Sequence, residues 1–344
     1  MARDGTREAW RAFICSGGGL RGCFQVGAID YLVNTAGIVP DLVCGISTGS
    51  LQALGLTVGA PADRTGLLLD VWNGLRKDSD VYSTPKLDLL WTIPALLADA
   101  LHAAITHSEM NGRWRNSIHR FTGLKKIILD TYDAARIESS DMRLIVGAVD
   151  LRSSRLTYFD SRCTMPVDAR DPDYDKRPLG SPRDVLASCS IPAFFPPVTI
   201  DERQFVDGGV RDIAPLSVAI HTLTEMAEDA GDVDPRFELY VILCDPPGVP
   251  RVSERRNILS ILLRTIDVMC NEIMNDDIKT AAKINAQLRA HDGLAATYRH
   301  FDLYRIEPRY ELIDVLEVDP VKIRAGMRQG RERAERALAN GPLP

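Results

Sequence analysis

Short apolar runs alternate with longer amphipathic stretches along most of this chain. The amphipathic stretches have helical periodicity and cover residues 21–34, 49–58, 216–228, 257–289 and 320–339. The apolar runs between them read as buried strands and lie at residues 13–15, 42–44, 144–149, 238–244 and 301–306. Strands that alternate with helices are typical of parallel sheets, so the pattern predicts an α/β fold of three α/β/α layers with a mainly parallel central sheet.

Two stretches interrupt this alternation. Residues 76–123 contain an apolar segment followed by a polar one, and we interpret them as a helical insertion over the core. Two readings of the insertion stay open: an ordinary buried helix, or a cap that lines an acyl-chain pocket or contacts a bilayer surface. Residues 163–182 are rich in Asp, Arg and Pro and follow a predicted hairpin at residues 156–159, so we expect a surface loop there.

Composition narrows the class of protein. The chain has 344 residues, 45% of them apolar and 26% charged, with a formal net charge of −6. These values are typical of a globular protein with a sizeable core, and the length fits one large domain over residues 10–340. The negative charge disfavours nucleic acid as a partner and leaves small molecules and lipids open.

Cysteine usage and apolar runs bear on location. The seven cysteines form no C-x-x-C pair, which disfavours a disulfide framework and a structural zinc and favours a reducing setting. No export signal is visible, and the longest apolar run, residues 89–98, is far shorter than the roughly 20 residues of a membrane span. We therefore expect a cytoplasmic protein, with peripheral contact at a membrane surface left open.

A glycine-rich string, SGGGLRG at residues 16–22, directly follows the first predicted strand. The N–H groups of Gly17, Gly18 and Gly19, together with a helix N-terminus, would form a cradle for negative charge. The string also satisfies the dinucleotide-binding pattern G-x-G-x-x-G, which calls for an acidic residue at the end of the second strand. The nearest acid, Asp41, precedes that strand, so the dinucleotide reading is disfavoured.

A second motif, GISTG at residues 45–49, lies between a predicted strand and a helix. This is the context of a nucleophile elbow, in which Gly45 and Gly49 permit a tight turn that exposes the Ser47 hydroxyl. The pattern alone is weak, because an ordinary tight turn would explain it. The 30 residues from Gly17 to Ser47 make one βαβ unit, which would place the glycine cradle beside the serine.

A nucleophilic serine needs a base, and the six histidines are poorly placed for that role. None falls in a predicted turn after a strand. A triad of Ser47, Asp245 and His300 is conceivable, but His300 enters a strand, whereas a hydrolase histidine is expected beyond the last one. The motif Asp207-Gly208-Gly209 follows a short apolar run and is, by itself, only a turn signal.

Taken together, SGGGLRG, GISTG and ASCSIPAFFPPV followed by DGG resemble the patatin-like phospholipase family over about residues 12–216. The resemblance implies one patatin-like catalytic domain that uses a Ser-Asp dyad and needs neither histidine, metal nor cofactor. It implies Ser47 as nucleophile and Asp207 as general base. The other positions that it implies are an oxyanion loop of Gly17, Gly18, Gly19 and Arg21, an elbow with Gly45 and Gly49, and a supporting turn of Gly208 and Gly209.

Three positions depart from the family pattern. Ser190 stands where alanine is usual, Thr48 where a smaller residue is preferred, and Ile213 where asparagine commonly supports the DGG turn. None of these is a catalytic position. We therefore expect an active enzyme with an altered rate or acyl preference.

The resulting hypothesis is a serine lipid acyl hydrolase of the phospholipase A or lysophospholipase type that acts through an acyl-Ser47 intermediate. Its expected partner is a phospholipid or another acyl ester. Two alternatives stay open: an acyltransferase or thioesterase that uses the same site, and a ligand-activated effector with latent activity.

Overall fold

The computed structural model describes residues 8–83, 117, 120–165, 174–248, 258–290, 300–311 and 313–343. Most of the expected insertion at residues 76–123 lies outside this part of the chain. Within it, residues Asp78–Asp80 form a short 3-10 helix, and α5 (Thr122–Thr131) begins at the end of the expected insertion.

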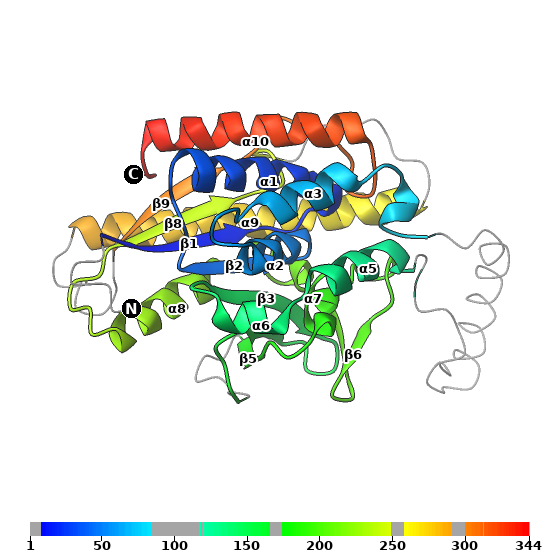
Figure 1. Cartoon of the computed structure of the whole chain (residues 1–344), viewed down its shortest axis with the longest axis horizontal. Coiled ribbons are helices and arrows are strands. Elements are labelled where there is room, and N and C mark those ends of the chain that lie inside the picture. Colours follow the sequence, from blue (N-terminus) through cyan, green and yellow to red (C-terminus); the bar gives the residue numbers. More distant parts are fainter. Residues whose placement is uncertain are drawn as a thin grey trace.

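The described residues form one nine-stranded sheet whose centre is parallel, as the sequence predicts (Figure 1). The five parallel strands, in spatial order, are β3 (Arg143–Asp150), β2 (Leu42–Ile46), β1 (Trp10–Cys15), β8 (Phe237–Ile242) and β9 (Phe301–Ile306). Both β4 (Leu156–Asp160) and β7 (Arg203–Asp207) pair antiparallel with β3. The sheet continues through β5 (Tyr174–Pro178) beside β4 and β6 (Val198–Ile200) beside β7.

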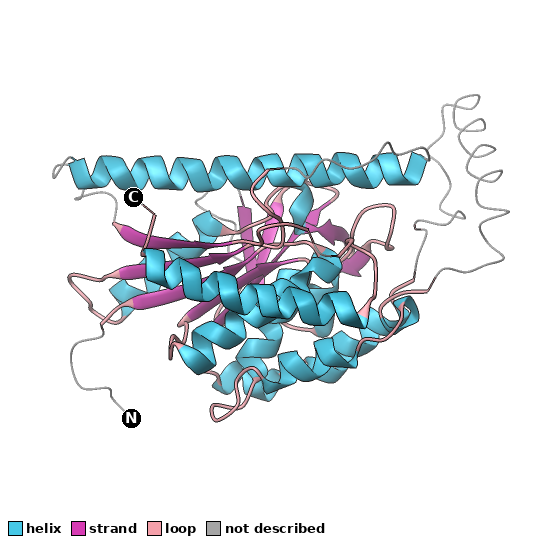
Figure 2. Cartoon of the chain, turned by 90° about the horizontal axis from the view of Figure 1, so that it is seen from above, coloured by secondary structure: helices cyan, strands magenta, loops and turns pink. Residues whose placement is uncertain are grey.

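Helices cover both faces of the sheet, which makes the three predicted layers (Figure 2). On one face lie α8 (Leu216–Asp229) and α9 (Ile258–Ala290). The other face carries α1 (Cys23–Asp30), α2 (Thr48–Val58), α3 (Gly66–Gly74), α5, α6 (Ala134–Ser139), α7 (Pro182–Ser188) and α10 (Pro320–Asn340). Strand β1 is buried on both sides, because Ile14 packs toward α8 and α9 whereas Phe13 and Cys15 pack toward α1 and α2.

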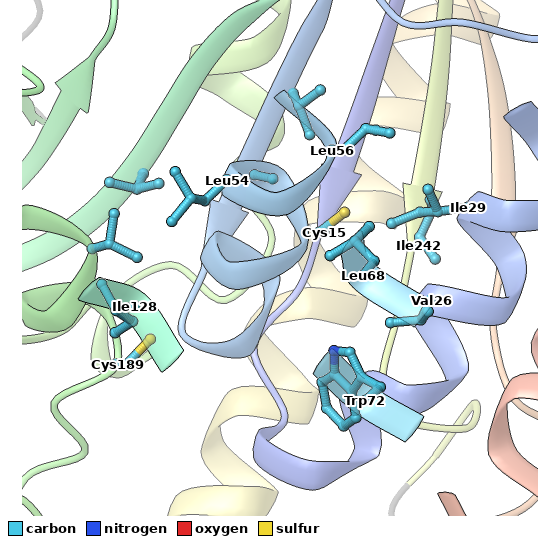
Figure 3. Close-up of a cluster of buried hydrophobic side chains, with 14 of the residues drawn as sticks. Cys15, Val26, Ile29, Leu54, Leu56, Leu68, Trp72, Ile128, Cys189 and Ile242 are labelled. Atoms are coloured by element: carbon cyan, nitrogen blue, oxygen red, sulfur yellow. The ribbon is translucent and has the colours of Figure 1, made fainter. Parts of the chain in front are cut away.

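Helix α2 lies at the centre of the larger hydrophobic cluster (Figure 3). Ten of its eleven residues are buried, and its Leu54 and Leu56 belong to the same cluster as Leu68 and Trp72 of α3. A helix that is apolar around its whole circumference is stable only when it is buried on all sides. The helix that follows Ser47 is therefore held firmly in place.

Residues 163–182, expected to be a surface loop, contain an element that the sequence did not reveal. Tyr174–Pro178 forms strand β5, which pairs in parallel with β4 at the edge of the sheet. Its polar residues hide the strand pattern, because an edge strand keeps charged side chains on its surface. Lys176, for example, forms an ion pair of 2.9 Å with Glu225 of α8.

None of the helices in the described part of the chain combines the length and apolar character needed to cross a bilayer. The helix predicted at residues 21–34 is present without a gap, but its hydrogen-bonding pattern changes along its length. It begins as a 3-10 turn (Gly19–Gly22), continues as α1 and ends as a π-helical turn (Tyr31–Thr35).

Helices α1 and α10 pack so closely that their contact requires glycine. A Cβ atom placed on Gly330 of α10 would lie 2.0 Å from the carbonyl oxygen of Phe24 in α1. One placed on Gly27 would lie 1.9 Å from the carbonyl oxygen of Met327. Both obstacles are backbone atoms, so a larger residue must push the two helices apart.

We expect Gly330→Ala to lower the free energy of unfolding by about 1–3 kcal/mol, because overpacking outweighs the better helix propensity of alanine. The matched control is Gly74→Ala at the end of α3, where a Cβ meets nothing within 4 Å. It should leave stability unchanged or raise it by up to about 1 kcal/mol. Urea unfolding of both variants checks this, and equal stabilities would contradict the close packing of α1 on α10.

Candidate active site

The predicted motifs meet at the carboxyl edge of the sheet. Cys15, the last residue of β1, is paired with Gly45 in β2 and with Ile242 at the end of β8. The glycine-rich loop follows β1 and Ser47 follows β2, so the two lie at neighbouring strand ends, as expected from the βαβ spacing. Strand β7 runs in the opposite direction and brings Asp207 level with Ala148 of β3, near the same edge.

Ser47 occupies a strained turn between β2 and α2. Its φ of 54° and ψ of −126° lie in a region that non-glycine residues rarely adopt and that costs about 1–3 kcal/mol. Surrounding groups hold the conformation: the Ser47 N–H donates to Ser188 Oγ at 3.0 Å, and its carbonyl accepts from Ser50 N at 2.9 Å and Cys189 Sγ at 3.2 Å. This strained strand-to-helix turn has the conformation of a nucleophile elbow.

Both glycines of the GISTG motif are required for steric reasons. A Cβ atom on Gly49 would lie 2.1 Å from the carbonyl oxygen of Cys15 in the neighbouring strand. One on Gly45 would lie 2.2 Å from the carbonyl oxygen of Gly49. The turn can therefore be this tight only when side chains are missing on both sides of Ser47.

Asp207 is buried beside Ser47 at the end of β7. Its Oδ1 accepts a hydrogen bond of 2.8 Å from the Gly209 N–H, and its own N–H donates to the carbonyl of Ser190 at 2.8 Å. Burial raises the pKa of Asp207 to about 6, although hydrogen bonds from the Ser47 side chain and the Gly209 amide oppose the rise. A carboxylate with this pKa is basic enough to accept a proton and still ionised at pH 7.

The glycine-rich loop runs beside Ser47. A Cβ atom on Gly17 would lie 3.1 Å from the Cβ of Ser47. The Gly17 N–H donates to the carbonyl of Ile213 at 3.0 Å, whereas the N–H groups of Gly18 and Gly19 have no hydrogen-bond acceptor within the described residues. Of the three predicted oxyanion donors, Gly18 and Gly19 thus keep their N–H groups available.

The guanidinium group of Arg21 binds carboxylates from three other parts of the chain. It contacts Asp245 after β8 at 2.5 Å, Asp267 on α9 at 3.2 Å and Glu311 after β9 at 2.8 Å. Burial lowers the pKa of Arg21, but the three carboxylates outweigh this effect and raise it. The Arg21 side chain is therefore engaged in these ion pairs, and its N–H donates to the carbonyl of Gly18 at 3.2 Å. The expected place of Arg21 in the oxyanion loop stays a prediction.

Helix α9 contributes groups that sequence reasoning did not associate with the site. Cys270 Sγ donates to the carbonyl of Gly209 at 3.2 Å, and Asp267 is the carboxylate bound to Arg21. These residues carry no recognisable motif and lie about 220 residues from Ser47 in the sequence. Only the ion pair with Arg21 and the contact with the DGG turn reveal them.

The histidine alternative fails on geometry. His300 immediately precedes β9, whose first residue, Phe301, is paired with Phe237 at the start of β8. It therefore lies at the amino edge of the sheet, a strand length of about 20 Å from the edge that carries Ser47. His221 lies within α8, where its Nδ1 is 3.1 Å from the hydroxyl of Tyr174. The remaining histidines, His102, His107, His119 and His291, lie outside the described residues.

The three departures from the family pattern are accommodated. Ile213 packs between the glycine loop and the DGG turn, because its Cδ1 lies 2.6 Å and 2.7 Å from the Cβ positions that Gly17 and Gly209 lack. Ser190 Oγ donates to the carbonyl of Pro196 at 2.7 Å. Thr48 is buried and accepts a long hydrogen bond of 3.4 Å from Gln52. Ile213 thus fills the space beside Asp207 rather than loosening it.

Two cavities meet at Ser47. The first, of about 790 Å³ and partly open to solvent, is lined mainly by apolar side chains of α2, α3 and α5 and of the segment after α7, among them Leu51, Leu68, Trp72, Ile127 and Phe195. The second, of about 570 Å³ and also partly open, is lined by the glycine loop, Asp207, Asp245 and Asp267. No group of three or more His, Cys, Asp or Glu residues in the described ranges is arranged to hold a metal ion.

A serine on a strained elbow beside a buried aspartate, at the carboxyl edge of a mainly parallel sheet, places the chain among α/β proteins with a nucleophile-elbow site. The model of the patatin-like phospholipase family matches residues 13–220, more than half of the chain. The chain therefore belongs to the patatin-like phospholipase family.

Two further comparisons accompany this match. Over 211 residues the chain is 25% identical to a cGAMP-activated phospholipase of Pseudomonas aeruginosa, covering 60% of this chain and 54% of that protein. The chain thus spans about half the length of this curated relative. The crystal structure of VipD from Legionella pneumophila aligns with 97% of this chain and 67% of that one, at 13% identity and a TM-score of 0.45.

We expect Arg21→Met to lower the free energy of unfolding by about 3–5 kcal/mol, because it leaves three partly buried carboxylates without their cation. The control Lys126→Met removes the cation of an exposed ion pair with Asp130, and it should cost less than about 1 kcal/mol. Guanidinium-induced unfolding measures both values. Similar losses in the two variants would show that the Arg21 cluster contributes no more than a surface pair.

Proposed function

We propose that this chain is a serine acyl hydrolase of the phospholipase A or lysophospholipase type, with Ser47 as nucleophile and Asp207 as general base. The observation that carries the proposal is the pairing of a strained, accessible serine turn with a buried aspartate whose pKa is raised to about 6. Membership of the patatin-like phospholipase family supports the hydrolysis of lipid esters in general.

The proposed reaction has two halves. Ser47 Oγ attacks the ester carbonyl carbon as its proton passes to Asp207, and the resulting oxyanion accepts hydrogen bonds from the free N–H groups of Gly18 and Gly19. The tetrahedral intermediate collapses to acyl-Ser47, and the departing alcohol takes the proton from Asp207. Water then gives a proton to Asp207 and attacks the acyl group, which releases the fatty acid and restores the Ser47 hydroxyl.

The apolar cavity is the proposed site for the acyl chain. Ser47 belongs to its lining, so a chain that extends into it would place its ester carbon at the nucleophile. The wall formed by α2 and α3 supplies Leu51, Leu68 and Trp72, and burial of a chain against such surface contributes about 0.8 kcal/mol for each CH₂ group. A phospholipid substrate also implies contact with a lipid surface, and the cytoplasmic location and peripheral membrane contact remain predictions from the sequence.

One comparison favours a second candidate function, in which the same site is latent until a ligand binds. The curated relative is named as cGAMP-activated, and the chain matches about half of its length. Acyl transfer or thioester hydrolysis through the same acyl-Ser47 also stays a hypothesis, and product analysis with competing acceptors would separate these reactions from ester hydrolysis.

We expect a fluorophosphonate probe to label the wild-type protein covalently at Ser47. Ser47→Ala should abolish labelling because the attacking oxygen is missing, and Asp207→Asn should slow it by at least about 100-fold because the base is lost. Intact mass and peptide mapping to residues 45–49 provide the measurement.

The matched control is Ser139→Ala on α6, which removes a hydroxyl that donates to the carbonyl of Ala135 and lines neither cavity. Rapid labelling of Asp207→Asn would refute the proposed base. If folded wild-type protein is labelled only after addition of cGAMP or a cell extract, the latent reading is correct.

The raised pKa of Asp207 makes the rate depend on pH. Below about pH 6 the carboxyl group is protonated and accepts no proton from Ser47, so the second-order labelling rate should fall about tenfold for each further pH unit. An aspartate with an ordinary pKa near 4 would keep the rate constant down to about pH 4. Labelling rates between pH 4.5 and 8, with circular dichroism to confirm folding, distinguish the two profiles, and a midpoint near pH 4 would contradict the desolvation of Asp207.

A further inference from the structure

We propose that the acidic wall of the second cavity selects the headgroup, so that phospholipids with an ammonium group are preferred over those with a net negative headgroup. This inference rests on the proposed hydrolase function and adds a substrate class to it. The residues that carry the preference are Asp245 and Asp267.

The two cavities around Ser47 differ in charge, because the second carries carboxylates within a mostly apolar lining. Ser47, Gly19, Ile191 and Val315 line both of them, so they adjoin at the nucleophile. An ester bound at Ser47 with its acyl chain in the apolar cavity directs its alcohol portion toward the other. In a phospholipid that portion carries the phosphate and the headgroup.

Every charged residue that lines the second cavity is an acid. They are Asp207, Asp245 and Asp267, and neither Lys, Arg nor His is among the described residues of its lining. Asp207 has the proposed role of base, whereas Asp245 and Asp267 have no part in the proton transfers. Their effect on a bound substrate is therefore electrostatic.

Within the described part of the chain, nearby cations do not fully neutralise this wall. Three carboxylates, Asp245, Asp267 and Glu311, face two guanidinium groups, Arg21 and the more distant Arg264, which lies 3.9 Å from Asp267. Asp207, which lines the cavity, is a fourth carboxylate. With all groups ionised, these described residues leave an excess of two negative charges.

The acidic wall is held in position before any substrate binds. Arg21 bridges Asp245 at the end of β8 and Asp267 on α9, and the Asp267 side chain is only 26% exposed. Fixed carboxylates in a partly desolvated cavity attract a cation more strongly than mobile surface carboxylates do, because they need no reorganisation when the cation binds. An ammonium headgroup supplies such a cation, whereas a glycerol or serine headgroup leaves the lipid with a net negative charge.

The test compares two lipids that differ only in the headgroup. Phosphatidylcholine and phosphatidylglycerol with identical acyl chains are presented at low mole fraction in neutral detergent micelles at pH 8, so that the surface charge is nearly equal and Asp207 is ionised. Both lipids carry the phosphate, so the ratio of their kcat/KM values isolates the ammonium group. We expect wild-type protein to prefer phosphatidylcholine by about tenfold, and the preference to shrink as salt is raised.

Asp267→Asn should reduce the preference at least about threefold, because one negative charge leaves the wall. The matched control is Asp276→Asn on the same helix, an exposed aspartate that pairs with Lys279 outside the cavity, and it should keep the wild-type ratio. Since the salt dependence is measured on wild-type protein, the inference stays testable even if Asp267→Asn folds poorly.

Hydrolysis of an uncharged p-nitrophenyl ester under the same conditions distinguishes a failure of the headgroup inference from a failure of the proposed hydrolase function. The headgroup inference alone is overturned if wild type cleaves that ester but its kcat/KM values for the two lipids agree within twofold. It is also overturned if the ratio of these values changes neither with salt nor with Asp267→Asn. If neither the ester nor the lipids are cleaved and the fluorophosphonate probe does not react, the hydrolase proposal falls and the inference falls with it.

Discussion

The site depends on one steric constraint, the tight turn at which the chain passes from β2 into α2. Ser47 adopts a φ of 54° there, and the carbonyl of Cys15 lies so close that position 49 tolerates only glycine. Such strain persists only where the surroundings enforce it. Here the surroundings are the burial of α2 and two hydrogen bonds: the Ser47 N–H donates to Ser188, and the Cys189 thiol donates to the Ser47 carbonyl.

A second constraint is the ionic cluster around Arg21. One guanidinium group joins the start of the first helical segment to α9 and to the chain beyond β8 and β9. The attraction between this buried arginine and its three carboxylates is opposed by a desolvation penalty, because each ion must lose its hydration. Two of these carboxylates, Asp245 and Asp267, also line the second cavity, so the ionic cluster and the proposed headgroup preference have one physical origin.

Local patterns were sufficient for the centre of the fold. The central strands are buried, so they appear in the sequence as apolar runs. The turns after β1, β2 and β7 are recognisable by their glycines, because the backbone there approaches other atoms too closely for a side chain. Strand β5 escaped prediction for the opposite reason. Its charged side chains are half-buried and held by ion pairs rather than replaced by apolar ones, so its sequence YDKRP has the composition of a loop.

The sequence by itself determined the alternation of the central strands with the longer helices, the positions of Ser47 and Asp207 in turns, and the family resemblance, because each depends on residues close together in the chain. Only the tertiary structure decided which N–H groups of the glycine loop are free, since the acceptor of Gly17 is Ile213, almost 200 residues away. The tertiary structure alone also placed Asp267 and Cys270 of α9 beside the second cavity. Burial and pairing across such separations leave no local pattern, because they arise when distant segments pack together.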